Sequence, residues 1–180
     1  RLKTPIMDKI ILYAPNIHKG GGLVLLKSLI DSWPKEAPIS GFLDIRIKNT
    51  IPLPENSDIT WVKNTLIHRI KAEIMLSRRA TTAEVVLFKN SLPPLFKCKA
   101  RVVVFMQNKN FIEKISLTDF KLKQAIQIFI ERLWSNIFCH RVDEYIVQTE
   151  SFKRLILDWC HRKGKSIPSI KVLPFMNPLD

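Results

Sequence analysis

The segment KIILYAPNIHKGGGLVLLKSLIDSW, residues 9–33, determines the fold class expected for this protein. Its apolar first part predicts a strand over Lys9–Ala14, and its last part predicts a helix over Gly22–Trp33. Three of the five glycines of the chain, Gly20 to Gly22, stand between the two. Glycines at such a junction are typical either of a tight turn or of a backbone that approaches an anion closely.

Alternating strand and helix patterns recur along the rest of the chain. Further strands are predicted over Phe42–Ile47, Ile59–Val62, Glu84–Phe88, Arg101–Gln107, Glu144–Gln148 and Ile170–Leu173. Further helices are predicted over Thr65–Arg79, Thr118–Cys139 and Glu150–Arg162, with Thr118 or Asp119 as the N-cap of the long one. We therefore expect one α/β domain over residues 7–180, a Rossmann-like parallel sheet of about seven strands with helices on both faces. We interpret residues 1–6 as a non-native remnant before a start at Met7.

The composition indicates which membrane, disulfide and metal-binding features we expect in this chain. No apolar run approaches the roughly 18 residues that a membrane span needs. The three cysteines, Cys98, Cys139 and Cys160, are odd in number and widely spaced, which predicts reduced thiols in a cytosolic compartment. Two Cys-His dipeptides lack the spacing of zinc ligands, so we expect no metal site.

The net charge of +13 favours an anionic partner, either nucleic acid, an acidic membrane surface or a phosphate-bearing substrate. From Trp61 to Arg101 there are nine lysines and arginines against two acids. The helix expected there has an apolar stripe (Leu66, Ile67, Ile70 and Ile74) and basic residues off it (Arg69, Lys71, Arg78 and Arg79). The stripe predicts packing on the sheet, and the four basic residues are candidates for contact with anionic lipid or are simply solvated. The helix containing AIQIFIERLWSNIF is apolar nearly all round, which predicts burial, with Trp134 and Phe138 at an interface.

Two nucleotide-binding motifs are excluded around the glycines. The sequence HKGGGLVL lacks the GxGxxG spacing of dinucleotide-binding folds and the GK[ST] of a P-loop. The expected second strand places Asp44 in its middle, whereas a dinucleotide fold needs an acid at the strand end. His18 and Lys19, which precede the glycines, favour an anion site over a plain turn.

Polar side chains follow two further strands. Gln107 and Asn108 follow one buried strand, and Thr149 and Glu150 follow another. Because carboxyl ends of parallel strands share one edge of the sheet, these side chains are candidates for contact with a ligand. Thr149 is also a competent N-cap, which explains it without a ligand. No nucleophile with its base and no paired carboxylates are apparent, so we assign no catalytic residue.

Four segments in order, KIILYAPNIHKGGGLVLLKSL, NSLPPLFKCKARVVVFMQN, EYIVQTESFKRLIL and VLPFMN, span nearly the whole chain. Together they resemble the N-terminal half of a GT-B glycosyltransferase, most closely the retaining enzymes of family 4. The resemblance implies two facing Rossmann-like domains, of which the C-terminal donor-binding domain is absent here. It also implies that Gly20, Gly21 and Gly22 approach the donor phosphates, and that the cleft includes His18, Lys19, Asn90, Gln107, Asn108, Thr149 and Glu150.

The sequence departs from the family at Gln107, where many members have a histidine, so no role of that histidine transfers. The resemblance implies transfer of a hexose from a nucleotide sugar to a saccharide or lipid-linked acceptor in cell-surface polysaccharide or lipopolysaccharide synthesis. It implies no cofactor, little activity without the donor domain, and a peripheral location on the inner face of the cytoplasmic membrane. The alternative is a basic α/β module without enzymatic activity that binds nucleic acid or an anionic membrane. No recognisable nucleic-acid-binding motif supports a nucleic-acid partner.

Overall fold

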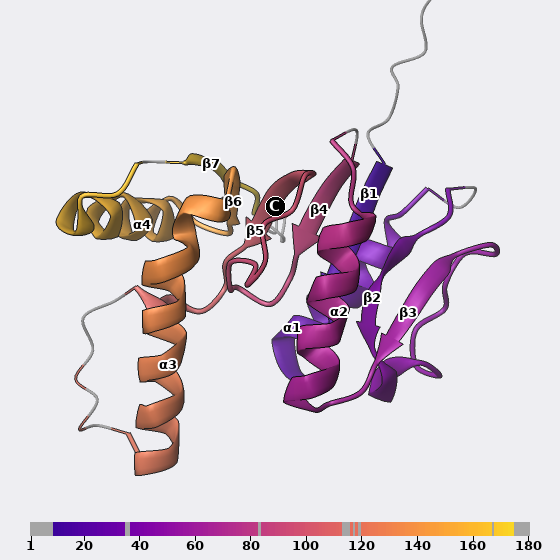
Figure 1. Cartoon of the computed structure of the whole chain (residues 1–180), viewed down its shortest axis with the longest axis horizontal. Coiled ribbons are helices and arrows are strands. Elements are labelled where there is room, and N and C mark those ends of the chain that lie inside the picture. The colour runs from indigo at the N-terminus through magenta and orange to yellow at the C-terminus, as the bar shows by residue number, and fades with distance from the viewer. Residues whose placement is uncertain are drawn as a thin grey trace, which may run out of the picture.

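The computed structural model describes residues 9–34, 37–82, 84–112, 116, 118, 120–166 and 168–174. Its centre is one parallel seven-stranded sheet in the order β3-β2-β1-β4-β5-β6-β7 (Figure 1). The strands are β1 Lys9–Ala14, β2 Ser40–Asp44, β3 Asp58–Val62, β4 Glu84–Phe88, β5 Arg101–Phe105, β6 Glu144–Val147 and β7 Ser169–Val172. The α-helices are α1 Gly20–Asp31, α2 Leu66–Arg79, α3 Leu122–Phe138 and α4 Glu150–Lys163, and the short 3-10 turns are η1 Ile45–Ile47, η2 Lys109–Phe111 and η4 Cys139–Arg141. The predicted Rossmann-like fold class is confirmed.

The strand order places a change of direction beside β1. The chain runs outward from β1 to β3, then returns and adds β4 to β7 on the other side of β1. The connections after β1 and β4 therefore diverge at the carboxyl ends of these strands, which is where open parallel sheets bind their ligands. Tyr13 lies near the end of β1, between the two halves of the sheet. It is in register with Phe42 of β2 on one side and with Phe88 of β4 on the other.

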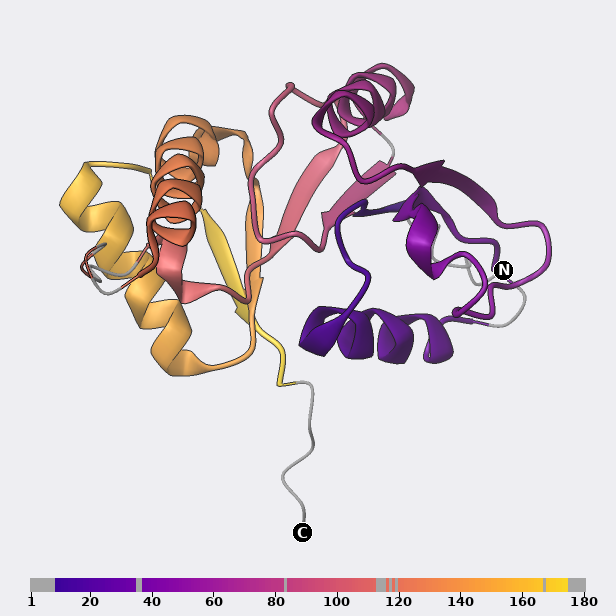
Figure 2. The same ribbon diagram turned by 90° about the horizontal axis from the view of Figure 1, so that it is seen from below.

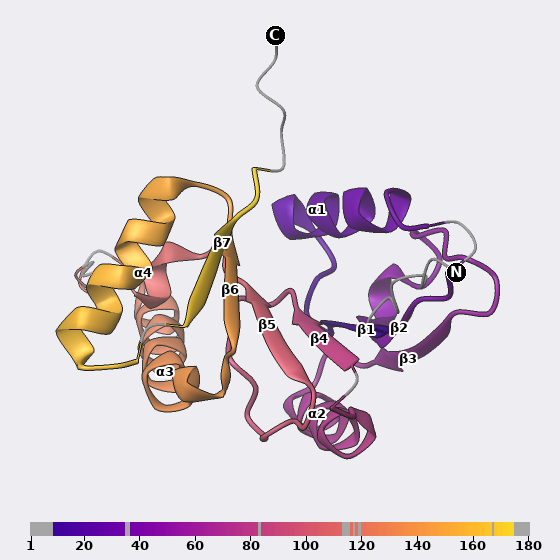
Figure 3. The same cartoon turned by 90° about the horizontal axis from the view of Figure 1, so that it is seen from above.

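Alternate residues of β1 face opposite layers of the molecule. Ile11 and Tyr13 belong to a core that α2 and α4 share, whereas Leu12 and Ala14 belong to a core that α1 covers. Figures 2 and 3 show α1 alone on one face of the sheet and α2 and α3 on the other. Helix α1 covers the second core with Leu26 and Ile30. Burial of each of these side chains stabilises the fold by about 1.5–3 kcal/mol.

The second strand ends earlier than predicted, at Asp44 instead of Ile47. The Asp44 carboxylate accepts a hydrogen bond from the Arg46 backbone N–H at 2.9 Å, which turns the chain into η1. The interpretation of Asp44 as a mid-strand residue is therefore wrong, and the exclusion of a dinucleotide motif rests on the missing GxGxxG spacing alone. Its carboxylate is fully buried and also binds the Arg46 guanidinium, with Nε at 2.9 Å and Nη2 at 2.6 Å. Burial alone would raise the pKa of Asp44, but the bonds and charge of Arg46 outweigh it and hold that pKa below its usual value.

The long helix α3 differs from its prediction at its start and in its burial. It begins at Leu122 with Lys121 as an N-cap that makes no side-chain bond, so Thr118 is not the cap, and Asp119 lies outside the described residues. The side chains of α3 that are buried are Ile128 and Ser135, so the prediction of a mostly buried helix is wrong. The predicted apolar stripe of α2 is wrong in part: Leu66 and Ile67 are exposed, and Ile70 and Ile74 are half-buried. The buried residues of α2 are instead Ala72, Glu73 and Leu76.

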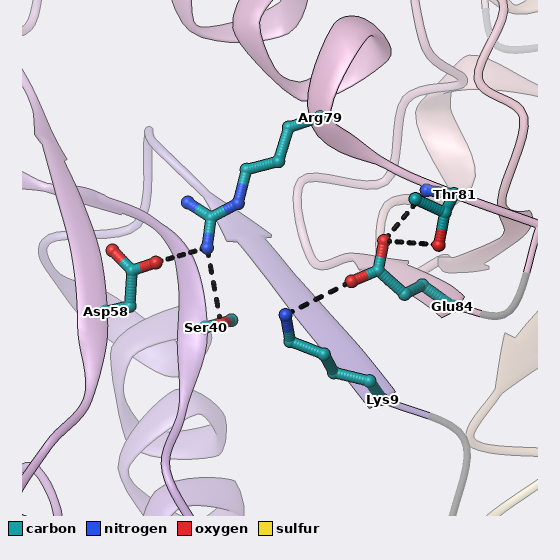
Figure 4. A network of polar contacts seen from close by, with 6 residues as sticks. All are labelled: Lys9, Ser40, Asp58, Arg79, Thr81 and Glu84. Carbon is teal, nitrogen blue, oxygen red and sulfur yellow. Dashed lines mark hydrogen bonds and ion pairs between the residues drawn. The ribbon is translucent and has the colours of Figure 1, made fainter.

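Two groups of polar contacts lie at the amino ends of the strands, one joining β1 to β4 and the other joining the end of α2 to β2 and β3 (Figure 4). Lys9 pairs with Glu84 at 3.3 Å, and Glu84 accepts hydrogen bonds from the backbone and hydroxyl of Thr81. Arg79, at the end of α2, pairs with Asp58 and lies 3.5 Å from the Ser40 hydroxyl. This network lies at the edge opposite the carboxyl ends and holds the sheet without approaching the candidate site.

Candidate functional site

A hollow of about 380 Å³ lies at the carboxyl edge of the sheet, where β1 and β4 diverge. We call it the switch-point hollow. Residues that follow β1, β4 and β5 contribute to its wall, together with the first turn of α1 and one face of α3. Its lining comprises Asn16, Ile17, Gly22, Lys89, Asn90, Ser91, Gln107, Asn108, Gln127 and Glu131. The structure therefore brings together four residues selected from the sequence: Gly22, Asn90, Gln107 and Asn108.

The three glycines form the first turn of α1 and not a loop before it. Gly20 has φ +67°, a conformation that favours glycine, and Lys19 is the N-cap without a side-chain bond. A Cβ on Gly21 would meet nothing within 4 Å in the described residues, and one on Gly22 would make only ordinary contact with Ile17 at 3.5 Å. Internal packing therefore does not require glycine at positions 21 and 22. The N–H groups of a first turn have no intrahelical acceptors, so this open turn presents donors and a positive dipole end.

Lys89 places a buried cation beside this turn. It follows β4 directly and is 2% exposed, and its Nζ lies 4.0 Å from the centroid of the Phe105 ring. Burial lowers the pKa of Lys89 to about 8, so the ammonium remains mostly protonated at neutral pH. In the sequence, Lys89 is only one of the nine cations of the basic region from Trp61 to Arg101. Its position immediately after an apolar strand was the signal that could have identified it.

Two buried polar atoms in the wall of the hollow have no hydrogen-bond partner in the described part of the chain, Asn90 Oδ1 and Gln107 Nε2. The backbone around them is well held. Ser91, which has φ +62°, receives a hydrogen bond from the Gln107 N–H at 3.0 Å and lies 3.4 Å from the Phe105 carbonyl. Leaving a buried polar atom unpaired costs roughly 1–3 kcal/mol. A ligand that donates a hydrogen bond to Asn90 Oδ1 and accepts one from Gln107 Nε2 would remove this cost.

Glu131 of α3 joins three neighbouring hollows. It lines the switch-point hollow, a more enclosed inner hollow of about 160 Å³ and an open groove of about 520 Å³ between α2 and α3, the α2–α3 groove. Its Oε1 accepts a hydrogen bond from Gln127 Nε2 at 2.9 Å, and burial raises its pKa. Glu131 was not among the residues predicted from the sequence, although it is the single acid of α3.

Glu73 lies at the bottom of the inner hollow, and its carboxylate is already engaged. Its Oε2 accepts a hydrogen bond from the Leu95 N–H at 2.6 Å, and Tyr13 adds a side-chain hydrogen bond. Burial raises the pKa of Glu73 to about 7. The wall opposite carries Trp134, whose indole N–H donates to the Pro93 carbonyl at 2.8 Å. Glu73 therefore holds the loop after β4 in place, and Trp134 contributes a fixed ring to the hollow.

A second open hollow, of about 340 Å³, lies beside the first at the ends of β5 and β6. Gln107 lines both, and Thr149 lines this one. The Thr149 hydroxyl accepts the Phe152 N–H at 3.2 Å, so its expected N-cap role is confirmed. Glu150 is exposed and pairs with Lys153 at 4.0 Å, outside the described lining of either hollow.

His18 and Lys19 stand beside the glycine turn but are not among the described residues that line the switch-point hollow. His18 lies close enough to Asp44 to contribute to the lowering of the pKa of that carboxylate. Its Nδ1 is buried and has no partner within the described ranges. Both residues thus border the glycines on the side of β2.

The four basic residues considered for membrane contact are divided between the two edges of the sheet. Arg69 lies in the α2–α3 groove, where it donates to Asn16 Oδ1 at 2.6 Å and to Asn64. Arg79 is paired with Asp58 at the opposite edge. Lys71 and Arg78 are exposed on α2.

No family model, curated protein or solved structure matches this chain. Within the described residues, no group of three or more His, Cys, Asp or Glu side chains is arranged to hold a metal ion. Across the same residues, none of the helices combines the length and hydropathy that crossing a membrane requires.

Proposed function

We propose that this chain is the acceptor-side domain of a glycosyltransferase. It would act in the transfer of a hexose from a nucleotide sugar to a saccharide or lipid-linked acceptor in cell-surface polysaccharide synthesis. One observation carries the proposal: Gly22 of the glycine turn, the buried Lys89 and Glu131 line the same polar hollow at the switch point. The resemblance to retaining GT-B enzymes supports the proposal. It implies that a second, C-terminal domain would bind the rest of the nucleotide sugar.

The glycine turn and Lys89 suit the diphosphate that leaves during transfer. Free N–H groups and the positive end of α1 stabilise anions, and the open space over Gly21 lets phosphate oxygens reach them. Lys89 adds a fixed positive charge in the same wall. Donors held in place before the reaction stabilise charge that develops on a leaving group, which lowers the barrier without a protein nucleophile.

The other side of the hollow suits a sugar hydroxyl. A hydroxyl both donates and accepts, so one acceptor sugar satisfies Asn90 Oδ1 and Gln107 Nε2 together. The Glu131 carboxylate has one oxygen bonded to Gln127, and its raised pKa makes it a better proton acceptor than an ordinary glutamate. Glu131 would therefore orient the attacking hydroxyl and accept its proton as the new glycosidic bond forms and the bond to the leaving diphosphate breaks. Gln107 contributes hydrogen bonding only.

The test is a transfer assay on the complete natural protein, with radiolabelled nucleotide hexoses and lipid-linked saccharides extracted from membranes. Gly21→Asp places a carboxylate where the diphosphate would bind, and we expect it to lower kcat/KM by about 100-fold or more. Glu131→Gln preserves the shape of the side chain but removes its charge, and we expect about a 10- to 100-fold loss in kcat.

Asp58→Asn is the matched control, because Asp58 belongs to the network at the opposite edge and we expect activity within about twofold of wild type. Absence of transfer from every nucleotide hexose would overturn the proposal. Wild-type turnover by Gly21→Asp would remove the phosphate role from the glycine turn. Tight, salt-dependent binding of RNA or DNA in place of transfer would favour the nucleic-acid alternative.

A further inference from the structure

Helix α3 presents a continuous apolar stripe to solvent. Six large apolar side chains of this helix are between 48% and 77% exposed: Leu122, Ile126, Phe129, Ile130, Leu133 and Ile137. At about 100° per residue they fall within a band about 100° wide, which lies opposite the buried Ile128 and Ser135. The first turn of α3 extends beyond the strands (Figure 1). Exposed apolar surface this continuous marks an interaction site.

The first turn of α2 adds to the same region. Leu66 and Ile67 are 69% and 65% exposed, and Arg69 of α2 and Ile126 and Ile130 of α3 line the α2–α3 groove together. Both helices lie on the same face of the sheet (Figure 3). The apolar stripe of α3 therefore borders the groove that leads to Glu131.

The charges around the stripe identify its partner. Each helix contains one acid, Glu73 in α2 and Glu131 in α3, and both line the inner hollow. Among the described residues of this region, by contrast, the exposed charged side chains are cations: Lys71 on α2, and Lys121 and Lys123 at the start of α3. Apolar side chains flanked by cations suit the surface of an anionic bilayer. A second copy of the chain would bring the same positive charge and be repelled.

We propose that the α3 stripe and the first turn of α2 dock on the surface of an anionic membrane. The apolar side chains enter the boundary between headgroups and acyl chains, and Lys121 and Lys123 bind the headgroups. Docking does not depend on the proposed transfer. If the chain is a glycosyltransferase domain, docking also turns the α2–α3 groove toward the bilayer, so that the saccharide of a lipid-linked acceptor reaches Glu131 from the membrane side.

The test measures co-sedimentation of the complete chain with vesicles of phosphatidylcholine alone and with vesicles containing phosphatidylglycerol. We expect binding to the anionic vesicles that weakens about tenfold or more in the double variant Ile126→Ser, Phe129→Ser and in the double variant Lys121→Glu, Lys123→Glu. Val24→Ser is the matched control, because Val24 is 66% exposed on α1, on the other face of the sheet, and its loss leaves binding unchanged. Circular dichroism verifies that all variants fold.

Equal binding by wild type and the apolar variant, or no binding to anionic vesicles, would overturn the docking surface. So would a dimer, seen by light scattering, that dissociates in the Phe129→Ser protein. Transfer to a water-soluble acceptor separates the two proposals. Loss of vesicle binding with that transfer intact supports docking as a separate function, whereas vesicle binding by a protein without any transfer activity overturns only the proposed enzyme.

Discussion

Glu73 on α2 binds the backbone N–H of Leu95 at 2.6 Å and so fastens that helix to the loop that follows β4. This loop carries Lys89 and Asn90 into the switch-point hollow. The carboxylate that holds it is buried, and burial raises the pKa of Glu73 to about 7. One buried acid thus holds the loop of the site in place, and its contribution to the free energy of unfolding depends on pH.

Glu73→Gln should abolish one component of the pH dependence of stability. Because the folded pKa of about 7 lies above the ordinary value of 4.5, Glu73 lowers stability as pH rises through that window. The wild-type protein should lose roughly 2–3 kcal/mol of stability between pH 5 and 8 from this group. Urea unfolding of both proteins across this range measures it. Asp44 and Glu84, whose pKa values are lowered, titrate below this pH range. Parallel pH profiles for the two proteins would contradict the raised pKa of Glu73.

Lys89→Met should make the protein more stable and its site weaker. The pKa of Lys89 is lowered to about 8 by burial, so folding at neutral pH holds an ammonium in an unfavourable environment. This penalty is present below pH 8 and disappears as pH rises toward the ordinary value of 10.5. We expect Lys89→Met to raise the free energy of unfolding at pH 7 by roughly 1–3 kcal/mol.

The same variant should weaken binding of inorganic pyrophosphate by about tenfold or more, because the cation beside Gly22 is lost. Calorimetric titration of the complete protein measures this affinity at pH 7 and pH 9. Wild-type affinity should fall between these values as Lys89 loses its proton, and the affinity of the variant should change less. A variant that is less stable, or that binds as tightly as wild type, would contradict the role of Lys89.

Gly41→Ala and Gly21→Ala should have opposite effects on stability. A Cβ on Gly41 would lie 2.3 Å from the Leu12 carbonyl oxygen, a backbone atom of the neighbouring strand that cannot move without breaking the β1–β2 ladder. We expect a loss of about 3 kcal/mol or more, seen as a fall in the thermal midpoint.

A Cβ on Gly21 meets nothing, and alanine in a helical turn is favoured over glycine, so Gly21→Ala should gain about 0.5–1 kcal/mol. Equal destabilisation by the two substitutions would show that the glycine turn is required for folding. The space above Gly21 would then not be evidence of a ligand.

Local sequence patterns were sufficient for the architecture. Apolar runs such as residues 84–88 became strands at their predicted positions, and the alternation with helices determined a parallel sheet. The physical reason is that these signals depend on residues close together in the chain. They are the periodicities of strands and helices, the positions of prolines and the N-cap at Thr149. A side chain that acts at the same short range also ended β2 early, because Asp44 bonds to the N–H of Arg46 two residues later.

Only the tertiary structure decided which apolar residues are covered and which polar residues meet. The apolar pattern of α3 resembles that of a core helix, but the fold buries Ile128 and Ser135 and leaves Phe129 and its neighbours exposed. Lys89 and Glu131 are 42 positions apart and line one hollow because β4 ends where α3 passes. Periodicity defines the faces of a helix, whereas burial depends on what packs against each face, and that is set by contacts between residues distant in the chain.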